Sequence, residues 1–148
     1  MQEAVQIRYE KLAEDVSLPE KSTGGAGAYD IRAYLKNKIV LAARQRSAIP
    51  TGLRFEIPDG FVLSVRPRSG LAIKEGLTMI NSPGTIDSDF RGEVQILVVN
   101  LGENEVTISP NDRIAQVILE RAYTIDWVEE DLNISDRGEN GFGSTGRK

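Results

Sequence analysis

The sequence contains no cysteine and no histidine among its 148 residues. Without cysteine, the chain can form no disulfide framework, thiol nucleophile or zinc–thiolate site. Without histidine, it can hold no Ser-His-Asp triad, no HExxH metal site and no imidazole base. If the protein is an enzyme, its chemistry must come from carboxylates, hydroxyls, lysine or arginine, backbone amides or a hard metal ion.

The chain also lacks a surplus of positive charge, because 18 Lys and Arg stand against 22 Asp and Glu, a formal net charge of −4. Proteins that bind the phosphate backbone of nucleic acid polymers normally carry a basic surplus. We therefore expect no nucleic acid polymer as a partner. A small anion held by a few local arginines is compatible with this charge balance.

No apolar run approaches the ~20 residues that a membrane-spanning helix needs. The start of the chain, residues 1–5, has neither the basic nor the apolar region of a signal peptide. We therefore expect no membrane partner and a cytoplasmic location. The length corresponds to one domain, and 40% hydrophobic residues are enough for a core.

Short runs rich in β-branched and aromatic residues, separated by Gly and Pro turns, predict an all-β sandwich, barrel or jelly roll. A turn is expected at 57–61, where Pro presets φ and Gly accepts a positive φ. One short helix is expected over 69–75, with Ser69 as its N-cap. The expected strands are 5–9, 29–35, 38–42, 52–57, 61–65, 93–101, 106–109, 113–119 and 124–128.

The C-terminal stretch is rich in glycine and contains few large apolar residues, so it cannot bury enough surface to order itself. We predict a β domain over 1–130 and a flexible arm over 131–148. A frayed terminus is the simplest interpretation of such an arm. However, Arg137, Phe142, Ser144 and Thr145 also offer a cation, an aromatic face and hydroxyls to a phosphorylated, ring-bearing ligand.

Three shorter clusters carry polar residues at the ends of predicted elements. Asp30 opens a strand, where an aspartate that bonds local amides is the simpler interpretation. Arg68 and Ser69 stand at the start of the helix, where free N–H groups and the helix dipole favour an anion. An ordinary capped helix is the alternative there. In residues 112–116, the polar pair Asp112 and Arg113 precedes a strand expected to be buried, and this pattern by itself indicates little about function.

Residues 81–93 form the richest cluster. Asn, Ser, Pro and Gly in succession predict a hairpin turn that exposes backbone donors and acceptors. Asp87 and Asp89 are expected to point the same way along a strand, with Ser88 and Phe90 opposite. The two carboxylates could form a salt-bridge ladder with nearby arginines, or one of them could act as a general base.

Taken together, five segments resemble the motifs of trimeric dUTPases, in order and along nearly the whole chain. They are GAYDIRA (27–33), RPRSGLA (66–72), NSPGTIDSDFRGEV (81–94), DRIAQVI (112–118) and RGENGFGSTG (137–146). The resemblance implies a homotrimer of distorted jelly-roll, β-barrel-like subunits with active sites between them. It also implies Mg²⁺-dependent hydrolysis of dUTP to dUMP and pyrophosphate by attack of water on the α-phosphorus. This reaction limits uracil in DNA and supplies dUMP for dTMP synthesis.

The resemblance also implies a role for each matching residue. Asp87 is the general base. Mg²⁺ is held mainly by the triphosphate, and Asp30 reaches it through water at most. The other implied residues bind substrate: Arg68, Ser69, Gly70 and Gln116 the α- and β-phosphates; Asn81, Gly84, Thr85, Ile86 and Gln95 the uracil; Phe90 the deoxyribose; and Arg137, Phe142, Gly143, Ser144 and Thr145, on the arm, the uracil face and the γ-phosphate.

The chain departs from the family pattern at three places, none of which removes a catalytic group. Gly27 and Ala28 stand where the family usually has Ala-Gly, Phe90 where tyrosine is more common, and Asn140 where glycine is common. Two alternatives remain. One is a dCTP deaminase-like enzyme of the same fold, in which the arm and the uracil hairpin are altered. The other is a non-catalytic dUTPase-like nucleotide-binding regulator, which should have lost Asp87 or the arm.

Overall fold

The computed structural model describes residues 4–147, so the first three residues of the N-terminal start and the last residue of the arm lie outside the described residues. Over this range the chain is nearly all β, with a single short helix α1, Ser69–Glu75, which confirms the predicted fold class. The strands are β1 Arg8–Lys11, β2 Tyr29–Arg32, β3 Ile39–Leu41, β4 Arg46–Pro50, β5 Leu53–Glu56, β6 Phe61–Arg66, β7 Leu77–Met79, β8 Gly84–Ile86, β9 Gln95–Asn100, β10 Val106–Ile108 and β11 Arg113–Arg121.

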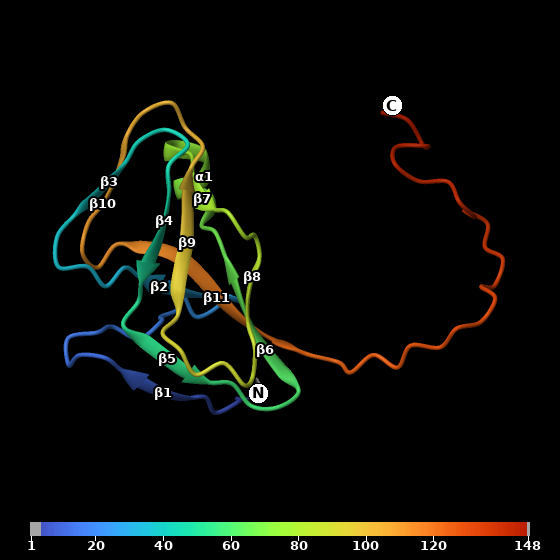
Figure 1. The fold of residues 1–148 in the computed structure, drawn as a ribbon, viewed down its shortest axis with the longest axis horizontal. Helices are drawn as coiled ribbons and strands as arrows, with labels where there is room; N and C mark the ends of the chain where they lie inside the picture. Colours follow the sequence, from blue (N-terminus) through green and yellow to red (C-terminus); the bar gives the residue numbers. More distant parts are fainter. Residues whose placement is uncertain (1–3, 148) are drawn as a thin grey trace.

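The strands form four small antiparallel sheets. The largest has the order β2-β11-β6-β8, the next has the order β4-β9-β7, and the pairs β1-β5 and β10-β3 complete the body. The long strand β11 pairs with β2 on one side and with β6 on the other. In Figure 1, β9 runs through the middle of the body, and β11 crosses it. The body is therefore a jelly-roll-like stack with the two larger sheets facing each other.

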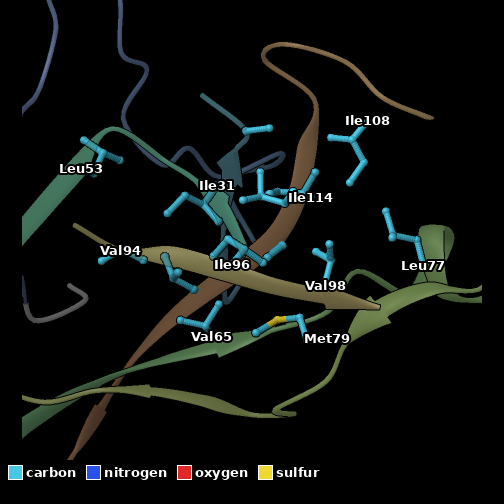
Figure 2. Close-up of a cluster of buried hydrophobic side chains, with 14 of the residues drawn as sticks. Ile31, Leu53, Val65, Leu77, Met79, Val94, Ile96, Val98, Ile108 and Ile114 are labelled. Carbon is cyan, nitrogen blue, oxygen red and sulfur yellow. The ribbon is translucent and has the colours of Figure 1, made fainter. Parts of the chain in front are cut away.

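The core lies between these two sheets. Alternate residues of β9, Ile96 and Val98, are 0% and 1% exposed, and they meet Ile31 of β2 and Val65 of β6 from the facing sheet (Figure 2). This alternation follows from the two-residue period of a strand, which sends every second side chain inward. Full burial of each such side chain contributes roughly 1.5–3 kcal/mol. The pattern fixes the register of the sheet β4-β9-β7, which packs against the sheet that carries most of the polar residues described below.

The end of α1 is held close to the end of β9 by a glycine and a buried amide. Gly76 has φ +70°, and a Cβ there would lie 2.4 Å from the backbone nitrogen of Gly102, so only glycine fits. Asn100 is fully buried; its Nδ2 donates to the carbonyls of Leu41 (3.0 Å) and Asn104 (2.8 Å), and its Oδ1 accepts from the Gly102 amide (2.9 Å). These contacts fix the position of the helix relative to the sheets.

The helix has the predicted bounds, but Ser69 is not its N-cap. Arg68 occupies that position with extended backbone (φ −96°, ψ 128°) and makes no side-chain capping bond. Its carbonyl already accepts the first helical hydrogen bond, from the amide of Ala72 at 3.1 Å. Ser69 is therefore the first helical residue, and the guanidinium of Arg68 is available for other contacts.

The predicted hairpin around residues 81–84 is wrong, because the strands on its two sides belong to different sheets. β7 pairs with β9, whereas β8 pairs with β6. The connection, which contains a cis Ser82–Pro83 bond, crosses from one sheet to the other. The Ile80 amide donates to the carbonyl of Leu97 at 3.0 Å, which continues the first sheet before the chain leaves it.

The predicted alternation of Asp87 and Asp89 along a strand is also wrong. β8 ends at Ile86, and the amide of Phe90 donates to the carbonyl of Asp87 at 3.2 Å, which closes a turn. The guanidinium of Arg91 braces this turn, since its Nη1 donates to the carbonyl of Ser88 at 2.6 Å. Asp87 is thus exposed in a braced turn and does not lie on the face of a sheet.

The strand predicted over 124–128 does not form in this chain. β11 ends at Arg121, and the Ala122 amide still donates to the carbonyl of Gly60 at 2.9 Å. Residues 123–147 then lead away from the body without a strand or helix (Figure 1). Trp127 is 85% exposed there. A β-strand needs a paired neighbour, and no described strand of the same chain pairs with this segment. The described residues contain no helix of the length and apolarity that a membrane span requires.

Candidate active site

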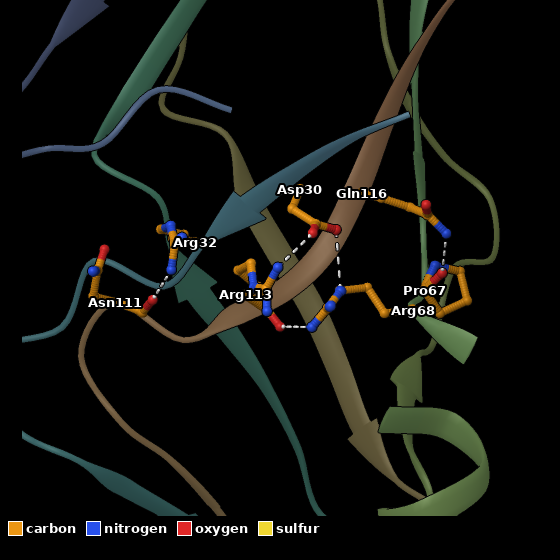
Figure 3. Close-up of polar contacts among 7 residues, drawn as sticks. All are labelled: Asp30, Arg32, Pro67, Arg68, Asn111, Arg113 and Gln116. Carbon is orange, nitrogen blue, oxygen red and sulfur yellow. Dashed lines mark hydrogen bonds and ion pairs between the residues drawn. The ribbon is translucent and has the colours of Figure 1, made fainter. Parts of the chain in front are cut away.

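Three neighbouring strands bring residues of separate sequence motifs to one level of the largest sheet. Asp30 of β2 lies opposite Gln116 of β11, which in turn lies opposite Arg66 of β6. Arg68 comes two residues after the end of β6, and its side chain reaches back toward Asp30 (Figure 3). The sheet thus gathers Asp30, Arg68 and Gln116, three of the residues singled out from the sequence.

The carboxylate of Asp30 is bonded on both oxygens. Nε of Arg68 lies 3.1 Å from Oδ1, and Nη1 of Arg113 lies 3.3 Å from Oδ2. The side chain of Asp30 is only 14% exposed, and that of Arg68 is 27% exposed. Arg68 also donates from Nη1 to the carbonyl of Arg113 at 2.9 Å (Figure 3). Charge-assisted hydrogen bonds between partly buried groups are stronger than their solvent-exposed counterparts.

Gln116 holds the backbone of the segment that carries Arg68. Its Nε2 donates to the carbonyl of Pro67 at 2.9 Å, which fixes the residue immediately before Arg68. Ser69 and Gly70, the first two residues of α1, are exposed beside it. This end of the sheet therefore presents amide and guanidinium donors together, an arrangement suited to phosphate oxygens.

A polar cleft of about 420 Å³ opens next to this cluster, and three arginines line it: Arg32, Arg68 and Arg113. Arg32 donates from Nη1 to the carbonyl of Asn111 at 2.9 Å. Arg32 and Arg113 stand within the segments 27–33 and 112–118, but the sequence assigned neither of them a role. The position of Arg113 depends on a register shift in β11 between Arg113 and Ala115. Such a bulge re-aims side chains and leaves no signal in hydrophobic alternation.

A smaller cleft of about 220 Å³ lies on the other side of Arg32 and Asn111. There the hydroxyl of Tyr34 donates to Oδ1 of Asp15 at 3.0 Å. This hydrogen bond raises the pKa of the Tyr34 phenol above its usual value. The phenol therefore stays protonated at neutral pH and provides no base.

The residues expected to read a base lie on and beside β8. Gly84 is buried, and a Cβ there would come within 3.3 Å of both Nδ2 of Asn81 and Cβ of Val65. The glycine therefore allows the Asn81 amide to approach the strand closely. Thr85 and Asn81 are exposed, whereas Ile86 is half-buried. Gln95 is exposed at the start of β9, in the other large sheet.

The ring of Phe90 folds back over Gly92. A Cβ built on Gly92 would lie 2.6 Å from Cζ and 3.0 Å from Cε2 of that ring. The ring is 43% exposed at the edge of the braced turn that carries Asp87. Gly92 therefore determines where the aromatic face sits, a relation that the residue types alone did not indicate.

The arm residues bond among themselves and contact no other part of the described chain. Nε of Arg137 donates to the carbonyl of Asn140 at 2.7 Å, and the amide of Ser144 donates to the carbonyl of Gly141 at 3.0 Å. Arg137, Asn140, Ser144 and Thr145 surround one hollow of about 490 Å³. Phe142 and Gly143 lie exposed beside it with positive φ values of 50° and 84°. The cation and hydroxyls of the arm thus face one space.

The structure leaves the three groups of residues apart within one chain. Asp87 follows Ile86, which lies opposite Leu63, whereas Arg68 comes after Arg66 at the far end of β6. The separation from Leu63 to Arg66 alone is about 10 Å at the rise of a strand. The arm extends away from both groups (Figure 1). Within one copy of the chain, the cleft that holds Arg68 includes neither Asp87 nor the arm residues.

A magnesium ion implied by the resemblance fits these residues only as an ion carried by a phosphate ligand. The described residues contain no group of three or more acidic side chains that could hold a metal ion. Asp30 is the carboxylate beside the guanidinium and amide donors that suit phosphate oxygens, and both of its oxygens are bonded to guanidinium groups. Mg²⁺ is commonly bound by one or two protein carboxylates together with substrate phosphates and water. A single carboxylate, Asp30, beside phosphate-binding groups is compatible with this mode of binding.

Comparison with known proteins points in one direction. A sequence model of the family described as dUTPase matches residues 14–146. The chain is 50% identical over 135 residues to the deoxyuridine 5′-triphosphate nucleotidohydrolase of Fusobacterium nucleatum subsp. nucleatum, covering 90% of this chain and 92% of that protein. It is 52% identical over 130 residues to the enzyme of the same name from Finegoldia magna, covering 87% and 91%. The solved dUTPase of Staphylococcus bacteriophage 80alpha with dUpNHpp is similar at a TM-score of 0.85 and 25% identity, over 97% of this chain and 100% of that one.

Proposed function

The chain belongs to the dUTPase family, and from this premise we propose that it hydrolyses dUTP to dUMP and pyrophosphate. The observation that carries the proposal is the convergence of Asp30, Arg68 and Gln116 at one end of the sheet, with exposed amides at the start of α1. These donors suit the α- and β-phosphates. The reaction limits uracil in DNA and supplies dUMP for dTMP synthesis, and we place it in the cytoplasm.

In the proposed mechanism, Asp87 is the general base. Its carboxylate takes a proton from a water molecule while the water oxygen bonds to the α-phosphorus. The bond from the α-phosphorus to the bridging oxygen breaks, and pyrophosphate leaves with that electron pair. A weak base suffices when cations withdraw charge from the phosphates and the water is held in line. The exposure of Asp87 in a braced turn leaves its oxygens accessible to such a water.

The remaining groups bind and enclose the substrate. Asn81 and the backbone of Gly84, Thr85 and Ile86, with Gln95, read the uracil edge. A mismatched base would leave buried polar groups unpaired. Phe90 lies against the deoxyribose and leaves no room for a 2′-OH. A Mg²⁺ ion would be held mainly by the triphosphate, with Asp30 reaching it through water at most, and it would supply neutralisation of the phosphate charge.

The arm completes the enclosure. Phe142 stacks on the uracil, and Gly143 gives the backbone its positive φ there. Arg137, Ser144 and Thr145, which share one hollow, hold the γ-phosphate. An arm that closes in this way excludes water other than the nucleophile.

We further propose that the site forms between three copies of the chain. The support is geometric: Asp87 follows Ile86, which pairs with Leu63 of β6, Arg68 comes after Arg66 at the end of that strand, and the arm leads away from both. Neighbouring copies can bring these surfaces together, whereas one copy holds them apart. A homotrimer would also supply the paired neighbours that the exposed segment 123–128 lacks within its own chain.

The proposed function is tested by release of pyrophosphate from dUTP, dCTP, dTTP and UTP in the presence of Mg²⁺. We expect kcat/KM for dUTP to exceed each of the others by about 10³-fold or more, because the site reads hydrogen-bonding groups. Turnover of dCTP equal to that of dUTP, or release of ammonia, would favour the deaminase-like alternative. Binding of dUTP without turnover would favour the non-catalytic regulator.

Substituting Gly92→Ala is expected to relax discrimination against UTP. The added Cβ would overlap the far end of the Phe90 ring, which must swing away from its present position. We expect the ratio of kcat/KM for dUTP to that for UTP to fall about 10-fold, the effect of losing a steric contact of a few atoms. Steady-state kinetics with both nucleotides measures the ratio.

The matched control is Gly25→Ala, where a Cβ meets nothing within 4 Å. This control should leave the ratio unchanged. If the alanine at position 92 lowers turnover of both nucleotides equally and leaves the ratio intact, Phe90 does not select the sugar.

A further inference from the structure

Asp30 occupies a position between two arginines, with each of its oxygens turned to a different guanidinium. The contacts are Oδ1 with Nε of Arg68 at 3.1 Å and Oδ2 with Nη1 of Arg113 at 3.3 Å (Figure 3). The two arginines come from different parts of the fold: Arg68 lies two residues after the end of β6, and Arg113 is the first residue of β11. A third bond, from Nη1 of Arg68 to the carbonyl of Arg113 at 2.9 Å, links them directly.

These contacts leave each guanidinium with unused donors. Arg68 uses Nε and Nη1, and Arg113 uses Nη1, whereas a guanidinium carries five N–H groups. Within residues 4–147, Nη2 of both arginines is without a bonded partner. Both side chains line the 420 Å³ cleft, and Arg113 is 44% exposed. The free donors of both groups are therefore accessible to an anion in or beside the cleft.

The charges of this cluster explain why a carboxylate is needed. Two guanidinium groups that bond to the same carboxylate repel each other. The Asp30 carboxylate offsets this repulsion, since its oxygens lie 3.1 Å from Nε of Arg68 and 3.3 Å from Nη1 of Arg113. One negative charge against two positive charges leaves the cluster with a net charge of +1. It thus remains attractive to a phosphate while its two cations are fixed in direction.

We propose that Asp30 is a positioning residue that fixes Arg68 and Arg113 as one phosphate-binding pair, and that Arg113 binds the substrate together with Arg68. This inference rests on the proposed function and assigns two roles beyond it. Arg113 becomes a ligand of the triphosphate. Asp30 acts through the two arginines, so its removal weakens binding in the absence of any metal ion.

The test measures the affinity for a dUTP analogue with an imido group between the α- and β-phosphorus, by titration calorimetry with EDTA and again with Mg²⁺. The variants are Asp30→Asn, Arg113→Gln and the double variant. We expect each single change to weaken binding about 10-fold in EDTA, and the double change to weaken it no more than about threefold further, because one unit is lost in each case. KM should rise by a similar factor.

The matched control is Arg32→Gln, which removes a guanidinium that lines the same cleft and bonds to the carbonyl of Asn111 instead of Asp30. It should bind the analogue within about twofold of the unaltered protein, because only the charge of the cleft has changed. Arg113→Lys keeps the charge and loses the planar fork, and we expect it to bind like Arg113→Gln. That variant also keeps the test decisive if Asp30→Asn fails to fold.

Each contrary outcome overturns the inference in a different way. Equal or tighter binding by Asp30→Asn in EDTA would mean that the carboxylate only lowers the positive charge. A loss confined to Mg²⁺ would assign Asp30 to the metal ion. If the losses of affinity multiply in the double variant, or if Arg113→Lys binds with full affinity, Asp30 does not fix Arg68 and Arg113 as one phosphate-binding pair. If the unaltered protein neither binds the analogue nor hydrolyses dUTP, the proposed function fails instead.

Discussion

Asp87→Asn is expected to lower kcat for dUTP by about 10³-fold, in the middle of the range for loss of a general base. Asparagine has the same shape but cannot accept the proton of the attacking water. The change should leave the fold intact, because Asp87 is exposed and its bond to the amide of Phe90 uses the backbone carbonyl. Pyrophosphate release measures turnover, and titration with the imido analogue should give an affinity within a few-fold of the unaltered protein.

Asp89→Asn provides the matched control for this experiment. Asp89 lies in the same turn, is also exposed and is likewise an aspartate. The proposed mechanism gives it no role, so turnover should stay within a few-fold. An equal loss in both variants would show that the local negative charge matters and not the base. Unchanged turnover per bound substrate in Asp87→Asn would reject Asp87 as the base.

The fold class was predictable because several short strands of this chain, among them β5, β7 and β10, bury alternate residues. Ile96 and Val98 on β9 show the two-residue period directly, and the turn at 57–61 follows from Pro58 and Gly60. The crossing at 80–83 was not predictable, because a tight turn within a hairpin and a tight link between two sheets use the same residue types. Which sheet receives β8 depends on its pairing with β6, a contact between distant parts of the chain.

The candidate site shows the same division between local and distant information. Motif resemblance indicated Asp30, Arg68 and Gln116, and the sheet brings them together. It assigned no role to Arg113, although this residue stands in the matched segment 112–118; the register shift in β11 beside Arg113 leaves no signal in the sequence pattern. Ser69 was predicted as a cap from its residue type alone. The extended backbone of Arg68, which shifts the helix start by one residue, depends on its surroundings.

Removal of residues 137–148 is expected to lower kcat/KM for dUTP by about 10²-fold or more, because the substrate would lose enclosure, stacking and its γ-phosphate partners at once. The arm residues Arg137, Phe142, Ser144 and Thr145 bond only within the arm in the described chain. The thermal midpoint and the oligomeric state should therefore not change. Steady-state kinetics and sedimentation of the shortened protein measure the two effects separately.

A shorter truncation, which removes only residues 147–148, is the matched control because it leaves the whole of motif 137–146 in place. It should retain full activity. Loss of activity in both truncations would place the important contacts beyond the motif. Dissociation of the longer truncation into monomers would show that the arm holds the subunits together. Full assembly with impaired turnover would instead show that the arm closes over the substrate. Assembly would then depend on the body and on segment 123–128, because the shortened chain keeps both.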